Sequence, residues 1–410
     1  MLFAQDLAIT GGRVVTVTKG IIENGTVIVR GGTIAAIGQG IPVPAGVKVI
    51  DARGLLVYPG MIDPNTTVGL VEVPADRMTD DTEERTKTNT AAVETAWAIA
   101  SDSEVIPVTR VNGITTVMTS PGTGNPIDGL TAIINLNGRV VDEMLVKAPA
   151  GLVFSINNSA RRAGGAPPGT RPGIVAMIRQ ELYDAQEYID KKTKAEQPAA
   201  PKKGEKAPEK KTPPAVDLNK DALGKVLKGE IPAIFFCREV QEIRAALHIA
   251  DEFKLKAVLL GADEADPLLD EIKSRNIPIL FDATYRAPSD RQPYDYYFRM
   301  AGRLEKAGVT FAFTTSTAHQ VRNLPYIAAQ SVAYGLSPET ALRAVTITTA
   351  NILGVADRLG SLEAGKVANI VVWDGDPLQI RSHVKHLIIA GKEVPLDTRQ
   401  TWLRDRYQKY

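Results

Sequence analysis

The stretch Tyr58-Pro59-Gly60-Met61-Ile62-Asp63 divides the sequence into two parts with different patterns. Residues 7–58, which precede it, consist of short runs rich in β-branched residues, with glycine pairs at Gly11-Gly12 and Gly31-Gly32. Such runs separated by glycine pairs are typical of β-hairpins. We therefore expect residues 7–58 to form part of a small β-sandwich, with a turn at each of these glycine pairs.

From about residue 59 onward, short apolar runs alternate with stretches of helical periodicity. A strand is expected at Ile231–Phe236, for example, and a helix at Val240–Phe253; a helix is also expected over residues 91–100. Alternation of this kind over roughly 250–300 residues favours a (β/α)8 barrel over an open sheet. After about residue 355 the pattern returns to β structure, including residues 368–373.

The prediction is thus an α/β protein in which a (β/α)8 TIM-like barrel is inserted into a small β-sandwich. Residues 1–58 and 355–410 would form the composite sandwich domain, and residues 59–354 the barrel. Within the barrel, residues 191–214 are rich in Lys, Glu, Pro and Ala with almost no apolar content, which predicts a disordered surface excursion. A partner-binding arm is the less favoured reading of the same segment.

The overall composition excludes several classes of protein. The net charge of +1 gives no electrostatic reason for binding nucleic acid, and no apolar run approaches the ~20 residues that span a bilayer. The single cysteine, Cys237, excludes an intrachain disulfide framework and a cysteine-rich zinc site. The start Met1-Leu2-Phe3-Ala4 is compatible with the stub of a trimmed secretory signal, hence a periplasmic or extracytoplasmic location, or with an ordinary cytoplasmic start.

Several long motifs occur in an order that resembles the amidohydrolase superfamily, most closely its imidazolonepropionase-like subgroup. In that family a Pro-Gly-aliphatic-Ile-Asp stretch like residues 59–63 leads into His-x-His at the first barrel strand. The other motifs that carry the resemblance are residues 120–130, 335–346, 351–354, 359–366 and 367–377, with Asn369 where Asp is usual. The resemblance implies hydrolysis of C–N bonds other than peptide bonds, with zinc or another divalent metal as cofactor. Members of the subgroup often carry a signal peptide, which favours the extracytoplasmic location.

The positions where the family places its metal ligands hold poor ligands in this sequence. Asn65 and Thr67 stand at the His-x-His positions, and Asn157 stands where a bridging Glu or modified Lys is usual. The positions of the two mid-barrel histidines and of the catalytic aspartate are occupied by Phe236, Gly261 and Ser316. Neutral amide and hydroxyl oxygens bind zinc weakly, and phenylalanine and glycine side chains do not bind it.

Other residues near the strand ends have side chains that can bind a metal ion. They are Asp63, Cys237, Asp263, Glu264, Asp282 and His319. Asp63 is expected to cap the loop after the first barrel strand. Cys237 follows Phe236, so strand alternation points its side chain away from the barrel centre, where it would pack. We therefore predict no metal, no catalytic residue and no cofactor, and a vestigial pocket made of Asp63, Asn65, Thr67, Asn157, Phe236, Gly261 and Ser316.

Three functions are compatible with this degenerate site. The favoured prediction is a catalytically inactive pseudoenzyme that acts as a scaffold or partner subunit, in a homo-oligomer or hetero-oligomer that could include an active paralogue. One alternative is an active hydrolase of cyclic amides with an atypical site, such as Ser316 or Cys237 with His319. The other is a small-molecule binding module that uses the vestigial pocket for a neutral polar ligand.

Overall fold

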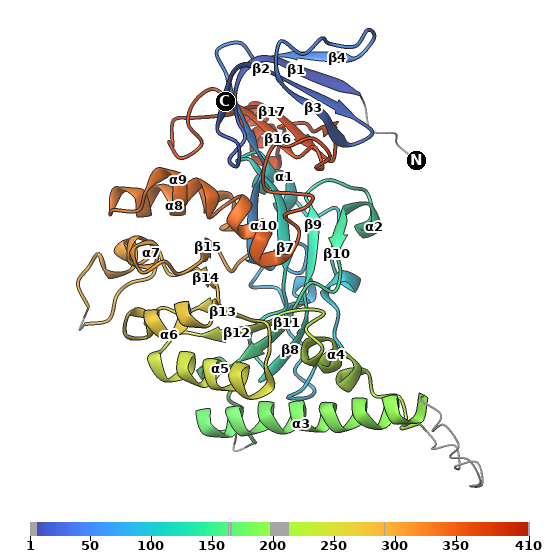
Figure 1. The fold of residues 1–410 in the computed structure, drawn as a ribbon, viewed down its shortest axis with the longest axis vertical. Coiled ribbons are helices and arrows are strands. Elements are labelled where there is room, and N and C mark those ends of the chain that lie inside the picture. Colours follow the sequence, from blue (N-terminus) through green and yellow to red (C-terminus); the bar gives the residue numbers. More distant parts are fainter. Residues whose placement is uncertain (1–5, 163, 165, 197–212, 291, 409–410) are drawn as a thin grey trace, which may run out of the picture.

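The computed structural model describes residues 6–162, 164, 166–196, 213–290 and 292–408. Strands from both chain ends share one sheet, at the top of Figure 1, in the order β18-β17-β16-β5-β1-β2-β3, with β4 also paired to β1. Its strands are β1 (Leu7–Val15), β2 (Ile21–Arg30), β3 (Thr33–Gln39), β4 (Lys48–Asp51), β5 (Leu56–Pro59), β16 (Ile370–Trp373), β17 (Val384–Ile389) and β18 (Lys392–Glu393).

The two glycine pairs in this sheet have different roles. Gly31-Gly32 forms the turn between β2 and β3, as expected. The expected turn at Gly11-Gly12 is wrong, because β1 continues through both residues and pairs with β2 with register shifts on either side of Gly12. Glycines can mark a bulge as well as a turn, and here the chain reverses instead around residues 16–20, where Thr16 N donates to Gly20 O.

The second group of strands has the parallel arrangement of a TIM-barrel-type fold. One sheet has the order β10-β9-β7-β6 and the other the order β15-β14-β13-β12-β11-β8. The strands are β6 (Met61–Thr66), β7 (Ile114–Thr119), β8 (Ile127–Leu130), β9 (Ala132–Asn135), β10 (Leu145–Lys147), β11 (Leu152–Ser155), β12 (Ala233–Cys237), β13 (Ala257–Gly261), β14 (Ile279–Phe281) and β15 (Phe311–Phe313). Strands β6 and β7 are parallel to each other, and so are β11 to β15 in succession.

Backbone hydrogen bonds continue from one of these sheets to the other. On one side Ser316 N, beyond β15, donates to Asn65 O in β6 at 3.0 Å. On the other side Thr131, between β8 and β9, exchanges hydrogen bonds with Gly151 O and Ala150 N. The segment β8–β9 differs from a regular (β/α)8 repeat, because it runs antiparallel to both β7 and β11.

Helices cover the outside of these strands, as Figure 1 shows for α5 to α9. They are α1 (Val105–Arg110), α2 (Val141–Met144), α3 (Arg171–Glu196), α4 (Leu218–Leu227), α5 (Val240–Phe253), α6 (Leu269–Ser274), α7 (Tyr296–Ala307), α8 (Leu324–Ala333), α9 (Pro338–Arg343), α10 (Ile347–Leu353) and α11 (Arg399–Tyr407). Short 3-10 turns are η1 (Arg77–Thr79), η2 (Thr95–Trp97), η3 (Asn158–Ala160), η4 (Asp266–Leu268) and η5 (Val321–Asn323). None of the helices within the described ranges is long and apolar enough to span a bilayer.

The helix expected over residues 91–100 is reduced to the short turn η2. The chain before it lies alongside β8, where Thr90 N donates to Ile127 O and Leu130 N donates to Val93 O. These backbone hydrogen bonds to a neighbouring strand compete with the helical ones, so tertiary pairing overrides the local helical pattern. The excursion predicted at 191–214 lies mostly outside the described residues; its first part continues α3 to Glu196.

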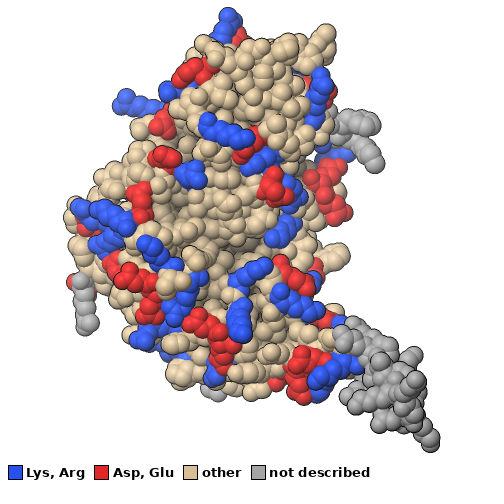
Figure 2. Space-filling model, viewed as in Figure 1, with Lys and Arg blue, Asp and Glu red and all other residues tan. Residues whose placement is uncertain are grey.

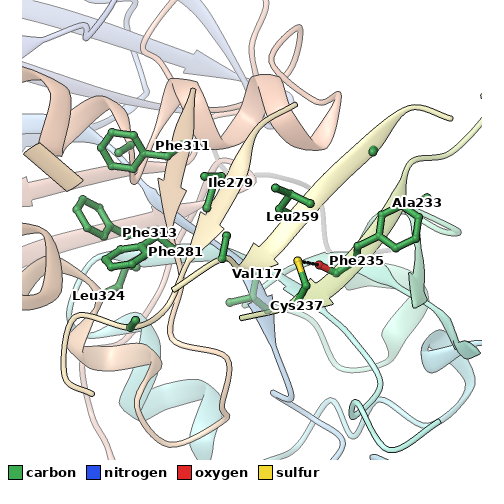
Figure 3. Close-up of a cluster of buried hydrophobic side chains, with 14 of the residues drawn as sticks. Val117, Ala233, Phe235, Cys237, Leu259, Ile279, Phe281, Phe311, Phe313 and Leu324 are labelled. Carbon is green, nitrogen blue, oxygen red and sulfur yellow. Dashed lines mark hydrogen bonds between the residues drawn. The ribbon is translucent and has the colours of Figure 1, made fainter. Parts of the chain in front are cut away.

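Alternation along the barrel strands separates two apolar clusters. In β12, Ile234 and Phe236 belong to the inner cluster, together with Leu260 of β13 and Leu353 of α10. Phe235 and Cys237 belong instead to the outer cluster, which also contains residues of the covering helices. Figure 3 shows this outer layer, with the Cys237 thiol beside the Phe235 carbonyl oxygen at 3.5 Å. The expectation that Cys237 packs away from the barrel centre is therefore confirmed.

The charged side chains on the face shown in Figure 2 are of both signs and interspersed. This distribution agrees with the net charge of +1.

Candidate functional site

The carboxyl ends of the parallel barrel strands form the candidate site, because loops that follow such strands are where TIM barrels place their chemistry. One half of this mouth is built by β6 and the segment after β15, and its central residue is Asp63, which is fully buried. Four donor groups contact its carboxylate: Thr314 Oγ1 at 2.5 Å, Thr315 Oγ1 at 2.7 Å, and the backbone N–H groups of Thr315 and Asn65. Asp63 thus joins the first barrel strand to the last, a role wider than the loop cap that the sequence suggested.

The ionisation of Asp63 reflects this environment. Burial raises the pKa of Asp63 to about 6, and the hydrogen bonds from Thr314 and Thr315 oppose the rise. The carboxylate is therefore mainly ionised at neutral pH, and hydroxyl and amide donors stabilise its negative charge.

Asn65 and Ser316 meet beside Asp63. Asn65 Nδ2 donates to Ser316 Oγ at 3.2 Å, and the Ser316 backbone N–H donates to Asn65 O. Asn65 is 7% exposed, and its Oδ1 atom has no hydrogen-bond partner. Thr67 follows the end of β6 and is half-buried. Asn65 within β6, Thr67 just after it and Ser316 after β15 therefore offer neutral oxygens and an amide.

The three remaining positions of the predicted pocket have structural roles. Asn157 caps η3 by accepting from Ser159 N at 3.1 Å. Phe236 is 8% exposed and fills the inner cluster of the barrel. Gly261 has a φ of +90°, and a Cβ atom there would lie 3.0 Å from Cys237 O. A histidine at position 261 would be strained in this backbone conformation.

The other half of the mouth contains a charged cluster that the sequence reasoning missed. Arg238, immediately after β12, donates through Nη1 to Asp263 and to Asp282, and through Nη2 to Asp282, each at 3.0 Å. Its guanidinium lies 4.6 Å from the centre of the Phe236 ring. Arg286 Nε approaches Asp263 at 3.3 Å. The sequence suggested Asp263 and Asp282 as possible metal ligands. It did not indicate that Arg238 would lie between them, although all three residues follow adjacent parallel strands.

Burial and charge act against each other in this cluster. Burial raises the pKa of Asp263 to about 6; Arg238 lowers it, and Asp282 adds to the rise. For Arg238, burial lowers the pKa, but Asp282 and Asp263 outweigh that effect and leave the pKa raised. The guanidinium therefore stays charged, and it is the main partner of both carboxylates.

A further buried carboxyl near the end of β11 was also missed. Asp128 in β8 accepts from Ser155 Oγ at 2.7 Å and from Asn125 N at 2.8 Å. Burial raises the pKa of Asp128 well above its ordinary value. These contacts fasten the loop that precedes β8 to the end of β11.

The residues of the mouth do not fit a divalent metal site of the zinc type. Across the described ranges, no three or more His, Cys, Asp or Glu side chains are arranged to hold a metal ion. The carboxylates of the mouth already have protein partners: Asp63 has hydroxyl and amide donors, and Asp263 and Asp282 have Arg238. Cys237 is buried in the outer layer, where burial raises the pKa of its thiol well above the usual value.

The remaining candidate donors also lie outside such a site. Glu264 Oε2 accepts from Val240 N at 3.3 Å, at the start of α5. His319 lines a cavity of about 160 Å³ together with Glu72, Glu104 and Arg322.

Comparisons with known proteins agree with the fold. A model described as "Amidohydrolase family" matches residues 261–394. The amidohydrolase tasK of Hapsidospora irregularis is 25% identical over 398 residues, which are 90% of this chain and 39% of tasK. A dihydroorotase of Geobacter sulfurreducens is 47% identical over 59 residues, 14% of each chain. A crystal structure of an amidohydrolase from Thermotoga maritima MSB8 has a TM-score of 0.86 and 28% identity, covering 95% of this chain and 99% of that chain.

The protein is an α/β protein with a fold of the TIM-barrel type. The chain is similar to the amidohydrolase family over residues 261–394, and over nearly its whole length it has the fold of the Thermotoga maritima amidohydrolase. It spans about two fifths of the length of tasK and a smaller part of the dihydroorotase.

Proposed function

We propose that this chain is a catalytically inactive member of the amidohydrolase superfamily that serves as a scaffold or partner subunit. The observation that carries the proposal is the commitment of Asp63, Asp263 and Asp282 to hydroxyl, amide and guanidinium partners of the chain itself. A carboxylate that activates water must be free to contact that water or a metal ion that binds it. In this mouth the carboxylates stabilise the fold instead.

The scaffold role has support from the size of one relative. In tasK, a region similar to this chain is joined to further sequence, since the match covers 39% of that protein. A chain with this fold could associate with a partner of the same superfamily through its outer helices. We propose such an oligomer, with itself or with an active paralogue, as the working assembly.

An active hydrolase built on Ser316 and His319 has little geometric support. Ser316 Oγ accepts from Asn65 Nδ2, and its φ of +56° is held by the hydrogen bond from Ser316 N to Asn65 O. His319 lines the separate cavity beside Glu72 and Arg322. A general base must lie within hydrogen-bond reach of the hydroxyl that it activates. The Asn65 amide contacts Ser316 Oγ as a donor, so it cannot take the hydroxyl proton.

A binding module is the second candidate, and one observation favours it. Asn65 Oδ1, Ser120 Oγ and Thr284 Oγ1 are buried and lack a hydrogen-bond partner. They follow or end β6, β7 and β14, all at the carboxyl ends of barrel strands. Buried polar atoms normally have a partner, so a neutral ligand with N–H or O–H groups would suit this position.

The expected result of an activity assay is no turnover of cyclic amides or ureides, with or without added Zn²⁺, Mn²⁺ or Ni²⁺. The reason is that, in the part of the chain that the structure describes, the mouth carboxylates Asp63, Asp263 and Asp282 are already bonded to protein donors. The assay compares the wild-type chain with the double variant Asn65→Ala/Ser316→Ala, and any background rate should be equal in the two. Metal-dependent turnover by the wild type that the double variant loses would contradict the proposal.

A further inference from the structure

Three carboxylate oxygens surround a single nitrogen atom in the barrel mouth. Nη1 of Arg238 lies 3.0 Å from Oδ1 of Asp263, 3.0 Å from Oδ2 of Asp263 and 3.0 Å from Oδ1 of Asp282. Nη2 contacts the other Asp282 oxygen, also at 3.0 Å. The guanidinium is therefore bidentate on Asp282 and shares one nitrogen with Asp263.

The surroundings make this a buried charge cluster and not a surface ion pair. The Asp263 and Asp282 side chains are each 4% exposed, and that of Arg238 is 20% exposed. The Phe236 ring lies against the guanidinium from the barrel interior. Arg286 reaches Asp263 with its more exposed side chain. Water therefore screens the two carboxylates little.

Two buried carboxylates that approach the same nitrogen atom need a positive charge between them. Without it, repulsion and the lost hydration would favour protonation or unfolding. A planar guanidinium satisfies several carboxylate oxygens at once, which a lysine ammonium does not do with the same geometry. A divalent ion such as Ca²⁺ is the other common solution, with oxygen ligands at about 2.3–2.6 Å.

We propose that Arg238 is a built-in cation of the barrel mouth, with Nη1 standing where a divalent metal ion would otherwise bridge Asp263 and Asp282. The inference rests on the proposed function in one respect only, namely that the wild-type mouth holds no metal. It goes further because it assigns to Arg238 the positive charge that such an ion would supply. Removal of Arg238 should then expose a cation-binding pair of carboxylates.

The first test is the thermal stability of Arg238→Ala. We expect its Tm to fall by about 5–10 °C, because breaking a buried ion pair from one side leaves uncompensated charge. The matched control is Arg179→Ala, which removes a bidentate but exposed pair with Glu252 and should shift Tm little. Equal Tm values for the two variants overturn the proposal.

The second test separates charge from packing. Like Arg238→Ala, the triple variant Arg238→Ala/Asp263→Asn/Asp282→Asn lacks the arginine side chain and its contact with Phe236. Unlike Arg238→Ala, it carries no buried carboxylate pair. The Tm of the triple variant should be higher than that of Arg238→Ala. In the extreme case the triple variant is folded and Arg238→Ala is unfolded. A triple variant no more stable than the single variant overturns the proposal.

The third test adds millimolar Ca²⁺, Mg²⁺ or Mn²⁺ to each protein, with EDTA as reference. At least one of these ions should raise the Tm of Arg238→Ala and leave the wild type and the triple variant unchanged. No cation-dependent shift in Arg238→Ala, or the same shift in the triple variant, overturns the inference while the proposed function stands. A tightly bound metal in the wild type would instead contradict the proposed function.

Discussion

Replacing Asp63 with alanine is expected to lower the free energy of unfolding by about 3–5 kcal/mol, as for other losses of a buried charged partner. The carboxylate is fully buried and accepts from the hydroxyls of Thr314 and Thr315 and from two backbone N–H groups. Its removal takes the acceptor from the Thr315 hydroxyl and from the two backbone N–H groups, while the Thr314 hydroxyl keeps the Asn65 carbonyl oxygen at 2.7 Å. It also weakens the contact between β6 and the end of β15. Urea denaturation followed by circular dichroism measures the change.

The matched control for this prediction is Asp80→Ala. Asp80 also accepts from a backbone N–H and a hydroxyl, both of Thr82, but it is exposed. Water can replace the carboxylate there, so the expected loss is below about 1 kcal/mol. If Asp63→Ala cost no more than Asp80→Ala, the idea that Asp63 closes the barrel would be wrong.

The second large effect is expected for Gly60→Ala. A Cβ atom at Gly60 would lie 2.0 Å from Thr115 Oγ1 and 2.3 Å from Thr115 Cγ2, in a buried position. The backbone cannot shift easily, because Gly60 N donates to Asn369 O and Met61 N donates to Gly113 O. We expect a loss of roughly 3 kcal/mol, the upper part of the usual range for overpacking, measured by the same denaturation.

A double-mutant cycle tests the cause of that loss. Thr115→Gly removes the three atoms nearest to the new Cβ, which are Oγ1, Cγ2 and Cβ of Thr115. In that background, adding Gly60→Ala should cost less than about 1 kcal/mol, so the two changes are strongly coupled. Equal costs of Gly60→Ala in the two backgrounds would show that the close approach to Thr115 is not the reason for glycine.

The alternation of patterns in the sequence predicted the fold, but some strand details were not accessible. The apolar runs of β12 and β13 carry the signal of buried parallel strands, because both faces are covered. The antiparallel direction of β8 carries no such signal, since an apolar run reads the same in both directions. The difference between the turn at Gly31 and the bulge at Gly12 depends on pairing with a strand, not on the glycines themselves.

The residue types at the family's ligand positions can be read from the sequence, but their contacts in the barrel mouth cannot. The identities of Asn65, Phe236 and Ser316 were enough to predict poor metal ligands. The two hydroxyl partners of Asp63, Thr314 and Thr315, lie about 250 residues away in sequence, so no local pattern indicates them. Arg238 follows a strand as many surface arginines do, and only the neighbouring strand order brings it between Asp263 and Asp282.

The most direct test of the central claim is the metal content of the purified protein. The chain would be produced in medium supplemented with zinc, manganese, iron and nickel, dialysed without chelator, and measured by elemental analysis. The account predicts far less than one metal ion per chain, because Arg238 already neutralises the carboxylates of the mouth. One tightly bound metal ion per chain would contradict it, and loss of that ion in Asp263→Asn/Asp282→Asn would assign it to these two carboxylates.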